Sequence, residues 1–407
     1  GYRHLCQLIT RRKRKKDFHL MSALPRRSKG LRVLTQSPAA LEHWHSLGVS
    51  VAAALPRRPL PGGHPLCLTA RRLDLPLVAT PGSFFLRPAD YAFHRLLRAI
   101  DQNTALSRLD IRQTAPKDAW LADADTYRRR FAACPQAITN AKHLAEKLTF
   151  TGPEFGPVMP PWRPSMAGRA TDADTDLHTA AYAGARRRYG DDLPEPVVDR
   201  LEHELGIIAQ MGFSAYFLVV EEIVTRSPRT CGRGSGAASL VAYCLGITNV
   251  CPVKHNLYFG RFLNPGRSDP PDIDVDFAWD ERDAVINAVL EHHQGHAAMV
   301  CSQVLFQPRM AVREVAKVYG LTDGEIGQVA KRLPWFFRTS ELDQGLMANL
   351  RQRPETRHLD FIEPWPEILA LAQRLIGHPR YLSVHPGGVV ITPNPIDHYV
   401  PVETAPK

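Results

Sequence analysis

The sequence predicts a multidomain α+β protein: a mixed α/β region, then a region of strands and loops, then a mostly helical region. Three observations predict this class. The 407 residues are enough for two or three domains at roughly 100–200 residues each. Prolines are concentrated between residues 151 and 170, which indicates a linker. Apolar residues alternate with Asp over 272–277, whereas after Pro308 they recur at helical spacing.

Individual elements follow from the same periodicities. In the first region, residues 75–80 are a candidate buried strand, and residues 91–100 and 121–147 have helical patterns. Beyond the linker, the apolar spacing predicts a helix over 195–208 and a buried helix or strand over 216–224. Helices are expected from Pro308 to about residue 376, followed by a glycine-containing strand pair over 384–402. The expected divisions of the chain are 1–150, the linker 151–170, 171–305, 306–383 and 384–407.

Composition excludes several classes of protein. With 44% hydrophobic and 23% charged residues, the chain is neither disordered nor fibrous. No apolar run approaches the roughly 18 residues of a membrane span, so no membrane association is expected. Seven scattered cysteines without a C-x-x-C pair argue against a disulfide framework or a thiolate zinc site, and favour the reducing cytoplasm.

The net charge of +10 resembles that of a nucleic-acid-binding protein, but the excess is local. Residues 1–60 contain thirteen Lys and Arg against two Asp and Glu, and the rest of the chain is close to neutral. The basic run over residues 11–16 is interpreted as a solvated loop rather than a nucleic-acid contact. DNA binding elsewhere therefore has to rest on local geometry.

The most informative segment is Asp-Ile-Asp-Val-Asp-Phe at 272–277. Period-two alternation predicts a strand whose apolar face packs on a core and whose other face carries three carboxylates. Such carboxylates repel one another unless a cation lies beside them. Side chains two apart on a strand can converge on two divalent ions about 3.5–4 Å apart, the arrangement used for phosphoryl transfer.

The same residues allow two other interpretations to be tested against the pattern. A solvated edge of an antiparallel sheet also alternates, and the strand alone leaves that alternative open. A calcium-binding loop beginning at Asp272 requires glycine at its sixth position and glutamate at its twelfth, where this chain has Phe277 and Asp283. The calcium interpretation therefore fails.

A glycine-rich loop, Cys-Gly-Arg-Gly-Ser-Gly-Ala-Ala-Ser at 231–239, leads into a short apolar helix. Small residues before a helix let backbone amides approach a phosphate, while Arg233, Ser235 and Ser239 add charge and hydroxyl donors. The loop matches neither the Walker nor the dinucleotide pattern. Alone, it is equally well explained as a tight turn with close helix packing. Together with the carboxylate strand, it predicts a nucleotidyl-transfer site.

Arg309, Arg313 and Lys317 are spaced four residues apart and share one helical face, with Ala311, Val315 and Val318 on another. A helix with cations on its outer face suits a nucleic-acid backbone. An ordinary solvated face fits this pattern equally well.

These motifs resemble the C family of bacterial replicative DNA polymerases, which comprises the DNA polymerase III alpha subunit and its error-prone relatives. The loop and the carboxylate strand together are highly specific to that family. The resemblance extends over nearly the whole chain, through GYRHLCQLIT (1–10), HRLLRAIDQNTALSRL (94–109), LEHELGIIAQMGFSAYF (201–217), GRGSGAASLVAYCLGIT (232–248), FGRFLNPGRSDPPDIDVDF (259–277) and HPGGVVI (385–391).

The resemblance implies a domain for each division of the chain. Residues 1–150 correspond to the C-terminal part of a degenerate polymerase-and-histidinol-phosphatase (PHP) domain, and 171–305 to a palm with a polymerase-beta-like nucleotidyltransferase fold. Residues 306–383 correspond to a mostly helical thumb, and 384–407 to the return to the palm.

The resemblance also implies site residues, cofactors and partners. Asp274 and Asp276 match the catalytic aspartates that bind two Mg²⁺ ions, and Gly234 and Ser235, next to Arg233, match the residues that hold the incoming triphosphate. The face formed by Arg309, Arg313 and Lys317 would grip duplex phosphates. The implied partners are primer–template DNA, deoxynucleoside triphosphates, a sliding clamp and other subunits of the polymerase holoenzyme.

The chain departs from the family pattern in three places. Relatives carry a third catalytic aspartate beyond the HPGGVV region, and by this resemblance we expect the chain to reach Lys407 before it. By the same resemblance, we expect the chain to begin after the early histidine ligands of the PHP domain. Where relatives read Ala-Thr-Gly-Asp-Val-His, residues 79–84 are Ala-Thr-Pro-Gly-Ser-Phe. We therefore expect a truncated chain without metal-dependent phosphatase activity and with undetectable primer extension on its own.

The first functional hypothesis is a DNA-directed DNA polymerase, a nucleotidyltransferase of bacterial DNA replication or repair, in which a primer 3′-OH attacks the α-phosphate of a deoxynucleoside triphosphate. The alternative is a catalytically inactive fragment or split-gene product that binds DNA or a partner polymerase subunit. A third, weaker hypothesis is a phosphoesterase in the N-terminal region.

Overall fold

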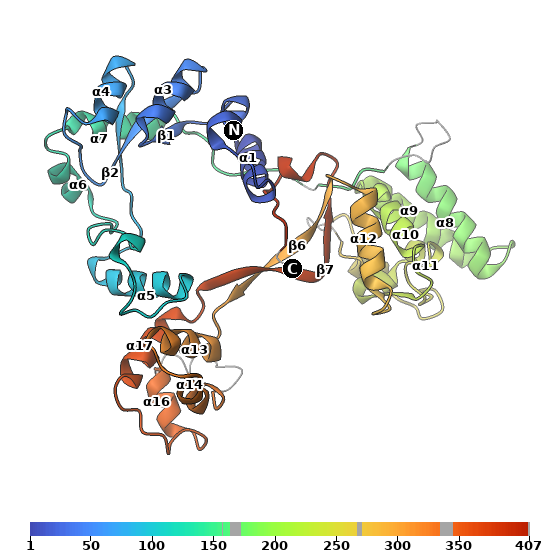
Figure 1. Ribbon diagram of the computed structural model, residues 1–407. Helices are drawn as coiled ribbons and strands as arrows, with labels where there is room; N and C mark the ends of the chain where they lie inside the picture. Colours follow the sequence, from blue (N-terminus) through green and yellow to red (C-terminus); the bar gives the residue numbers. More distant parts are fainter. Residues whose placement is uncertain (157, 163–171, 267–270, 334–344, 406–407) are drawn as a thin grey trace. The chain divides into compact units, whose positions relative to one another are not determined.

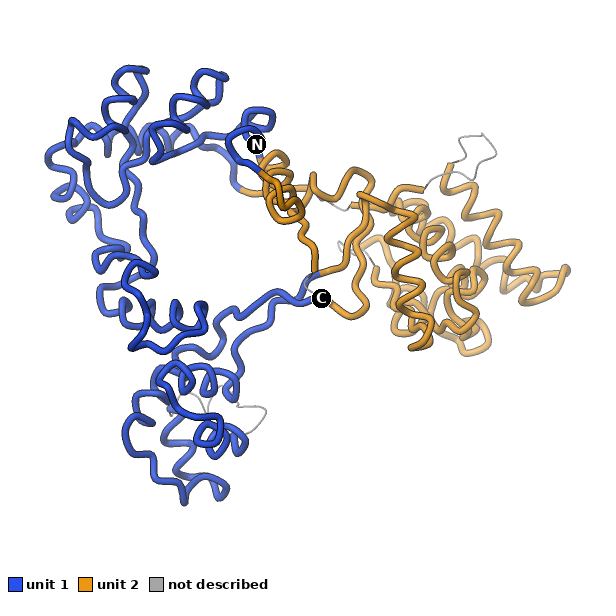
Figure 2. The backbone as a smooth tube through the Cα atoms, in the orientation of Figure 1, with its two compact units in different colours: residues 1, 19–151, 301–384 blue, residues 2–18, 152–300, 385–407 orange. Residues whose placement is uncertain are grey.

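The computed structural model describes residues 1–156, 158–162, 172–266, 271–333 and 345–405. The described chain forms two compact units (Figure 2). Unit 1 comprises residue 1, residues 19–151 and residues 301–384, and unit 2 comprises residues 2–18, 152–300 and 385–407. Most of the expected 151–170 linker lies outside the described residues. Elements are labelled as in Figure 1.

Unit 1 begins as the α/β region that the sequence predicts. Three parallel strands are ordered β1 (Val33–Thr35), β2 (Val51–Pro56) and β3 (Leu77–Thr80). Parallel strands need crossover connections, and α3 (Pro38–Ser46) and α4 (Pro65–Arg72) supply them. Residues 51–55 of the central strand are all buried, as expected for a strand covered on both faces. The strand expected at 75–80 is confirmed as β3.

The helical pattern over 121–147 forms two helices, α6 (Ala124–Arg130) and α7 (Pro135–Glu146), rather than one. Pro135 occupies the first turn of α7, where its missing N–H costs nothing and its fixed φ starts a new helix. Helix α7 packs on the sheet, and the Asn140 side chain donates to the Leu77 carbonyl over 2.9 Å. The short helix α2 (Leu20–Ala23) precedes the sheet.

The rest of unit 1 is a helical bundle made of two distant parts of the chain. Helices α13 (Pro308–Val318), α14 (Asp323–Ala330), α16 (Leu346–Gln352) and α17 (Trp365–Leu375) share one core with α5 (Tyr91–Asp101). The inward face predicted for α13 is confirmed, because Ala311, Val315 and Val318 are all buried. Residues 334–344 of the expected helical stretch lie outside the described residues.

Unit 2 has a helical core. Helices α8 (Ala173–Tyr189), α9 (Glu195–Gln210), α10 (Ser214–Val224) and α11 (Leu240–Cys244) contribute to it, and α12 (Arg282–His292) follows later in the chain. The helix expected over 195–208 is therefore confirmed, and the ambiguous segment 216–224 is a helix. No single described helix is long and apolar enough to span a membrane, although α9 and α10, bent by 112°, pass that test as a pair.

The strand pair predicted over 384–402 is wrong. A single strand, β7 (Pro379–Ile391), occupies the first half of that range, and its partner is β6 (Ala297–Leu305). The following residues, Thr-Pro-Asn-Pro, place prolines at 393 and 395. Proline has no N–H for a ladder, so the chain leaves the sheet there.

Helix α1 (Tyr2–Arg14) packs against the C-terminal segment within unit 2. The Val402 amide donates to Thr10 Oγ1 over 3.0 Å, and Lys13 Nζ lies 2.8 Å from Glu403 Oε2. The basic run over 11–16 is therefore not wholly a loop, because its first four residues form the last turn of α1. Cations are favourable there because the helix dipole is negative at its C-terminal end.

Candidate functional site

The glycine-rich loop and the carboxylate strand lie side by side in unit 2. Strand β4 (Thr230–Arg233) pairs antiparallel with β5 (Asp274–Phe277), with Arg233 opposite Asp274 and Cys231 opposite Asp276. Directly opposed residues project from the same face of a sheet. Arg233 therefore shares a face with Asp274 and Asp276.

The alternation predicted for this strand is confirmed. Asp272, Asp274 and Asp276 are exposed, whereas Ile273, Val275 and Phe277 are half-buried against the helical core of unit 2. The backbone amide of Ile273 donates to the Tyr216 hydroxyl over 3.3 Å, which anchors the start of the strand to α10. Burial raises the pKa of Tyr216, so its hydroxyl stays protonated.

Gly234 begins a tight 3₁₀ turn over residues 234–238, and its φ of +70° is a conformation that favours glycine. A Cβ at this position would lie 3.4 Å from Asp274 Oδ2. The neighbouring Arg233 Nε lies 3.1 Å from Asp276 Oδ1, and both of these side chains are more than 60% exposed. Ser235 follows in the same exposed turn. The structure thus brings together the five site residues predicted on the loop and the strand.

A buried carboxylate that the sequence analysis missed holds the far end of the loop. Glu204 on α9 is fully buried, and its Oε2 accepts hydrogen bonds from Ser239 Oγ at 2.9 Å, Leu240 N at 2.7 Å and Val241 N at 3.2 Å. Leu240 and Val241 open α11, whose first amides have no partner within the helix. Glu204 therefore caps α11 from another helix.

Arg200, one turn earlier on α9, completes this network. Its Nε donates to Glu204 Oε1 over 2.5 Å, and its Nη2 donates to the carbonyls of Ala238 and Leu257 over 3.0 Å each. Burial raises the pKa of Glu204, and the Arg200 guanidinium and the Leu240 amide act against that rise. The pair ties the end of the loop to α9.

This network corrects the role expected for the helix after the loop. The first amides of α11 donate to Glu204, and the hydroxyl of Ser239 is buried between Glu204 and the Ala242 amide. A phosphate is therefore not needed to satisfy this helix end. The exposed donors on the loop belong to its beginning, at Arg233, Gly234 and Ser235.

The opposite end of the strand pair is also fixed by charge. Arg229 Nη2 lies 2.7 Å from Asp280 Oδ2 and 2.6 Å from Glu281 Oε1. The Arg229 guanidinium lowers the pKa of Asp280, and the Ser227 hydroxyl together with Arg229 lowers the pKa of Glu281. These acids remain ionised, so the pairing holds the start of β4 to the end of β5.

The three cations predicted on the outer face of α13 belong to unit 1 and are not equivalent. Arg309 donates to the carbonyls of Ala330, Lys331 and Leu333 over 3.0–3.1 Å, which closes the C-terminal end of α14. Arg313 Nη2 lies 3.4 Å from Asp323 Oδ1, and Lys317 Nζ lies 2.7 Å from Asn103 Oδ1. Arg309 thus serves the fold, while Arg313 and Lys317 make single contacts nearer the surface.

The chemistry of the donor set at β5 fits a hard divalent cation. Asp274 and Asp276 present carboxylate oxygens on one exposed face, and oxygen is the donor that Mg²⁺ prefers. The guanidinium of Arg233 already lies against Asp276, which shows that this face accommodates positive charge.

Comparison with known proteins agrees with the resemblance seen in the sequence motifs. Residues 175–407, more than half of the chain, match the family described as the bacterial DNA polymerase III alpha NTPase domain. The protein named error-prone DNA polymerase in Nocardia farcinica is 35% identical over 347 residues, which are 84% of this chain and 28% of the relative. Its namesake in Mycobacterium tuberculosis is 35% identical over 83% of this chain and 29% of the relative.

A third protein of that name, from Bdellovibrio bacteriovorus, is 40% identical over 54% of this chain and 21% of its own length. The chain thus spans less than a third of the length of these curated relatives. The family match confirms the resemblance inferred from the motifs. The chain belongs to the C family of bacterial DNA polymerases, the family of the DNA polymerase III alpha subunit and its error-prone relatives.

Proposed function

We propose that the chain forms part of a cytoplasmic DNA-directed DNA polymerase, in which residues 171–305 act as the palm, 306–383 as the thumb and 1–150 as the remnant of a PHP domain. The observation that carries the proposal is the pairing of β4 with β5. It places the loop residues Arg233 and Gly234 against Asp274 and Asp276. A phosphate-binding loop beside paired carboxylates is the arrangement that nucleotidyl transfer requires.

In this proposal Asp274 and Asp276 hold two Mg²⁺ ions. When bound, the metal supplies charge neutralisation for the triphosphate and a lower pKa for the primer hydroxyl. Arg233 moves from Asp276 to the incoming triphosphate, an exchange that its exposure permits at small cost. Gly234 and Ser235 let the phosphates approach the backbone of the turn, and the Glu204–Arg200 pair keeps that turn in place.

Triphosphate binding tests this proposal. We expect Arg233→Ala to weaken Mg²⁺-dependent binding of a fluorescent deoxynucleoside triphosphate about tenfold, because one charge-assisted contact of about 1.4 kcal/mol is lost. Binding of the corresponding monophosphate should change little. Fluorescence anisotropy of the full chain, with and without EDTA, measures both.

Arg282→Ala is the matched control, because Arg282 is an exposed arginine of unit 2 whose guanidinium pairs with the neighbouring Asp283. Its triphosphate affinity should equal that of the wild type. Triphosphate binding that is absent, or that is unaffected by both EDTA and Arg233→Ala, would contradict the polymerase site. If the chain still bound DNA in that case, it would instead be the catalytically inactive fragment or split-gene product that binds DNA.

We further propose that Arg313 and Lys317 contact the duplex backbone. The double variant Arg313→Ala plus Lys317→Ala should make the negative slope of log affinity against log salt shallower by about two, since each phosphate contact contributes about −0.9. Anisotropy titrations of a primer–template duplex at several salt concentrations measure the slope. Arg309 is left intact because it closes α14.

The control for this experiment is Arg128→Ala plus Arg129→Ala. These residues are two exposed cations on α6 in the same unit. Arg128 pairs with Asp125, and Arg129 donates to Thr126, both on the same helix. They lie outside the proposed thumb, so the slope should not change. Equal slopes for both double variants would remove α13 from the DNA-binding surface.

A further inference from the structure

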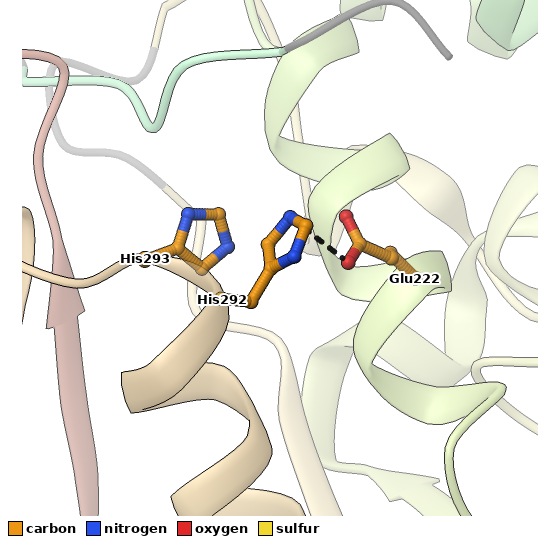
Figure 3. A group of neighbouring side chains, drawn as sticks. All are labelled: Glu222, His292 and His293. Atoms are coloured by element: carbon orange, nitrogen blue, oxygen red, sulfur yellow. Dashed lines mark ion pairs between the residues drawn. The ribbon is translucent and has the colours of Figure 1, made fainter. Parts of the chain in front are cut away.

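Unit 2 contains a second group of ligand-type side chains, away from the carboxylate strand. Glu222 lies near the end of α10, His292 is the last residue of α12, and His293 follows it (Figure 3). One ligand atom from each of the three lies within 4.8 Å of the other two. Among the described residues, no other group of three His, Cys, Asp or Glu side chains brings its ligand atoms this close together.

The spacing suits a tetrahedral ion. His292 Nε2 lies 3.4 Å from Glu222 Oε1. Two ligands bound at about 2.0–2.2 Å to one tetrahedral zinc ion are about 3.3–3.6 Å apart. The rings of His292 and His293 stand at 88° with centroids 4.7 Å apart, so the two imidazoles are neighbours at the end of α12.

The donor atoms of this group favour a different metal from the Mg²⁺ proposed for the carboxylates on β5. Two imidazole nitrogens and one carboxylate oxygen suit Zn²⁺, Co²⁺ or Ni²⁺, whereas Mg²⁺ prefers oxygen ligands alone. His293 is only 5% exposed, so one ligand is already held in place. Arg226 Nη2 donates to Glu222 Oε1 over 2.7 Å, and ligating carboxylates in metal sites are themselves hydrogen-bonded in this way.

We propose that Glu222, His292 and His293 form a binding site for a zinc-class divalent ion, with water in the fourth position. The ion would fasten the end of α12 to α10. Because only four residues separate the end of β5 from the start of α12, this link would hold the element that follows the carboxylate strand. The site is structural and does not depend on the polymerase proposal.

Cobalt provides a direct probe, because tetrahedral Co²⁺ absorbs visible light when bound and Zn²⁺ displaces it. We expect the full chain to bind one Co²⁺ with a tetrahedral spectrum, to release it to Zn²⁺ and to retain it in excess Mg²⁺. Zn²⁺ should also raise the midpoint of thermal unfolding, since an ion that binds the folded state stabilises it. His292→Ala should weaken Co²⁺ binding at least tenfold, about 1.4 kcal/mol.

The control is His178→Ala. His178 Nε2 lies 3.2 Å from Glu202 Oε1, which is a similar exposed His–Glu pair on helices of the same unit. It lies outside the group of three, so Co²⁺ binding should not change. Glu222→Gln is a second ligand variant. It leaves the buried His293 in place, so the fold should tolerate it. Asp274→Asn plus Asp276→Asn should retain Co²⁺, which separates this site from the proposed polymerase site.

Wild-type protein that takes up no Co²⁺ would overturn the proposal. Co²⁺ uptake that is undiminished in both His292→Ala and Glu222→Gln would also overturn it, because the ion would then be bound elsewhere.

Discussion

Glu204→Ala is expected to lower the free energy of unfolding of unit 2 by about 3–5 kcal/mol, the cost of removing one partner from a buried ion pair. The substitution leaves the first two amides of α11 and the Ser239 hydroxyl without their acceptor in a site that excludes water. It also leaves the guanidinium of Arg200 without its carboxylate. Each loss alone costs about 1–3 kcal/mol.

Chemical denaturation followed by circular dichroism measures this effect, with Glu202→Ala as the control. Glu202 lies two residues earlier on α9, is half-exposed, and accepts from Tyr182 and His178. Its loss should cost about 1 kcal/mol or less. Glu204→Gln should fall between the two, because the amide keeps one acceptor oxygen but loses the charge. Equal destabilisation by Glu204→Ala and Glu202→Ala would mean that the buried network does not support the loop.

The carboxylate strand shows what local pattern reveals. Alternation over 272–277 is a property of consecutive residues, and it correctly predicted which side chains are exposed and which pack on the core. The pairing of that strand with the glycine-rich loop was predicted from chemistry, since a phosphate-binding loop and paired carboxylates are useful only together. The register that places Arg233 opposite Asp274 depends on tertiary packing.

The sequence pattern does not predict the role of Glu204. It lies three residues after Leu201 and four before Ile208, so it interrupts the apolar face of α9. A charged residue on such a face is the available signal for a buried partner. The partners, however, are the loop end and the start of α11, more than thirty residues away in the chain. No helical periodicity can identify them.

Arg309 and α5 illustrate the same limit on a larger scale. The spacing of Arg309, Arg313 and Lys317 correctly placed them on one helix, but their partners come from α14 and from the loop after α5. Phe93, Leu96 and Ala99 have an ordinary amphipathic spacing that does not specify what they pack against. Their place in a bundle with residues 306–376 results from packing between distant segments.

Asp274→Asn plus Asp276→Asn is expected to weaken divalent-metal binding at the β4–β5 face by at least about 100-fold, or about 2.7 kcal/mol. The two carboxylates supply the negative charge that binds a hard cation, and an amide oxygen retains the shape of the ligand without its charge. The fold should tolerate the change. Both side chains are exposed, and the ion pair that Asp276 loses with Arg233 contributes about 1 kcal/mol or less.

Electron paramagnetic resonance of Mn²⁺ measures this binding directly, because the signal of the free ion disappears on binding. Mn²⁺ forms the weakest complexes with nitrogen ligands among the common divalent transition metals, so the Glu222–His292–His293 group should contribute little to the titration. Asp191→Asn plus Asp192→Asn is the matched control, because it removes two exposed aspartates of the same unit that lie between α8 and α9. If the two double variants lose Mn²⁺ affinity equally, the ion responds to general negative charge, and Asp274 and Asp276 are not a specific metal site.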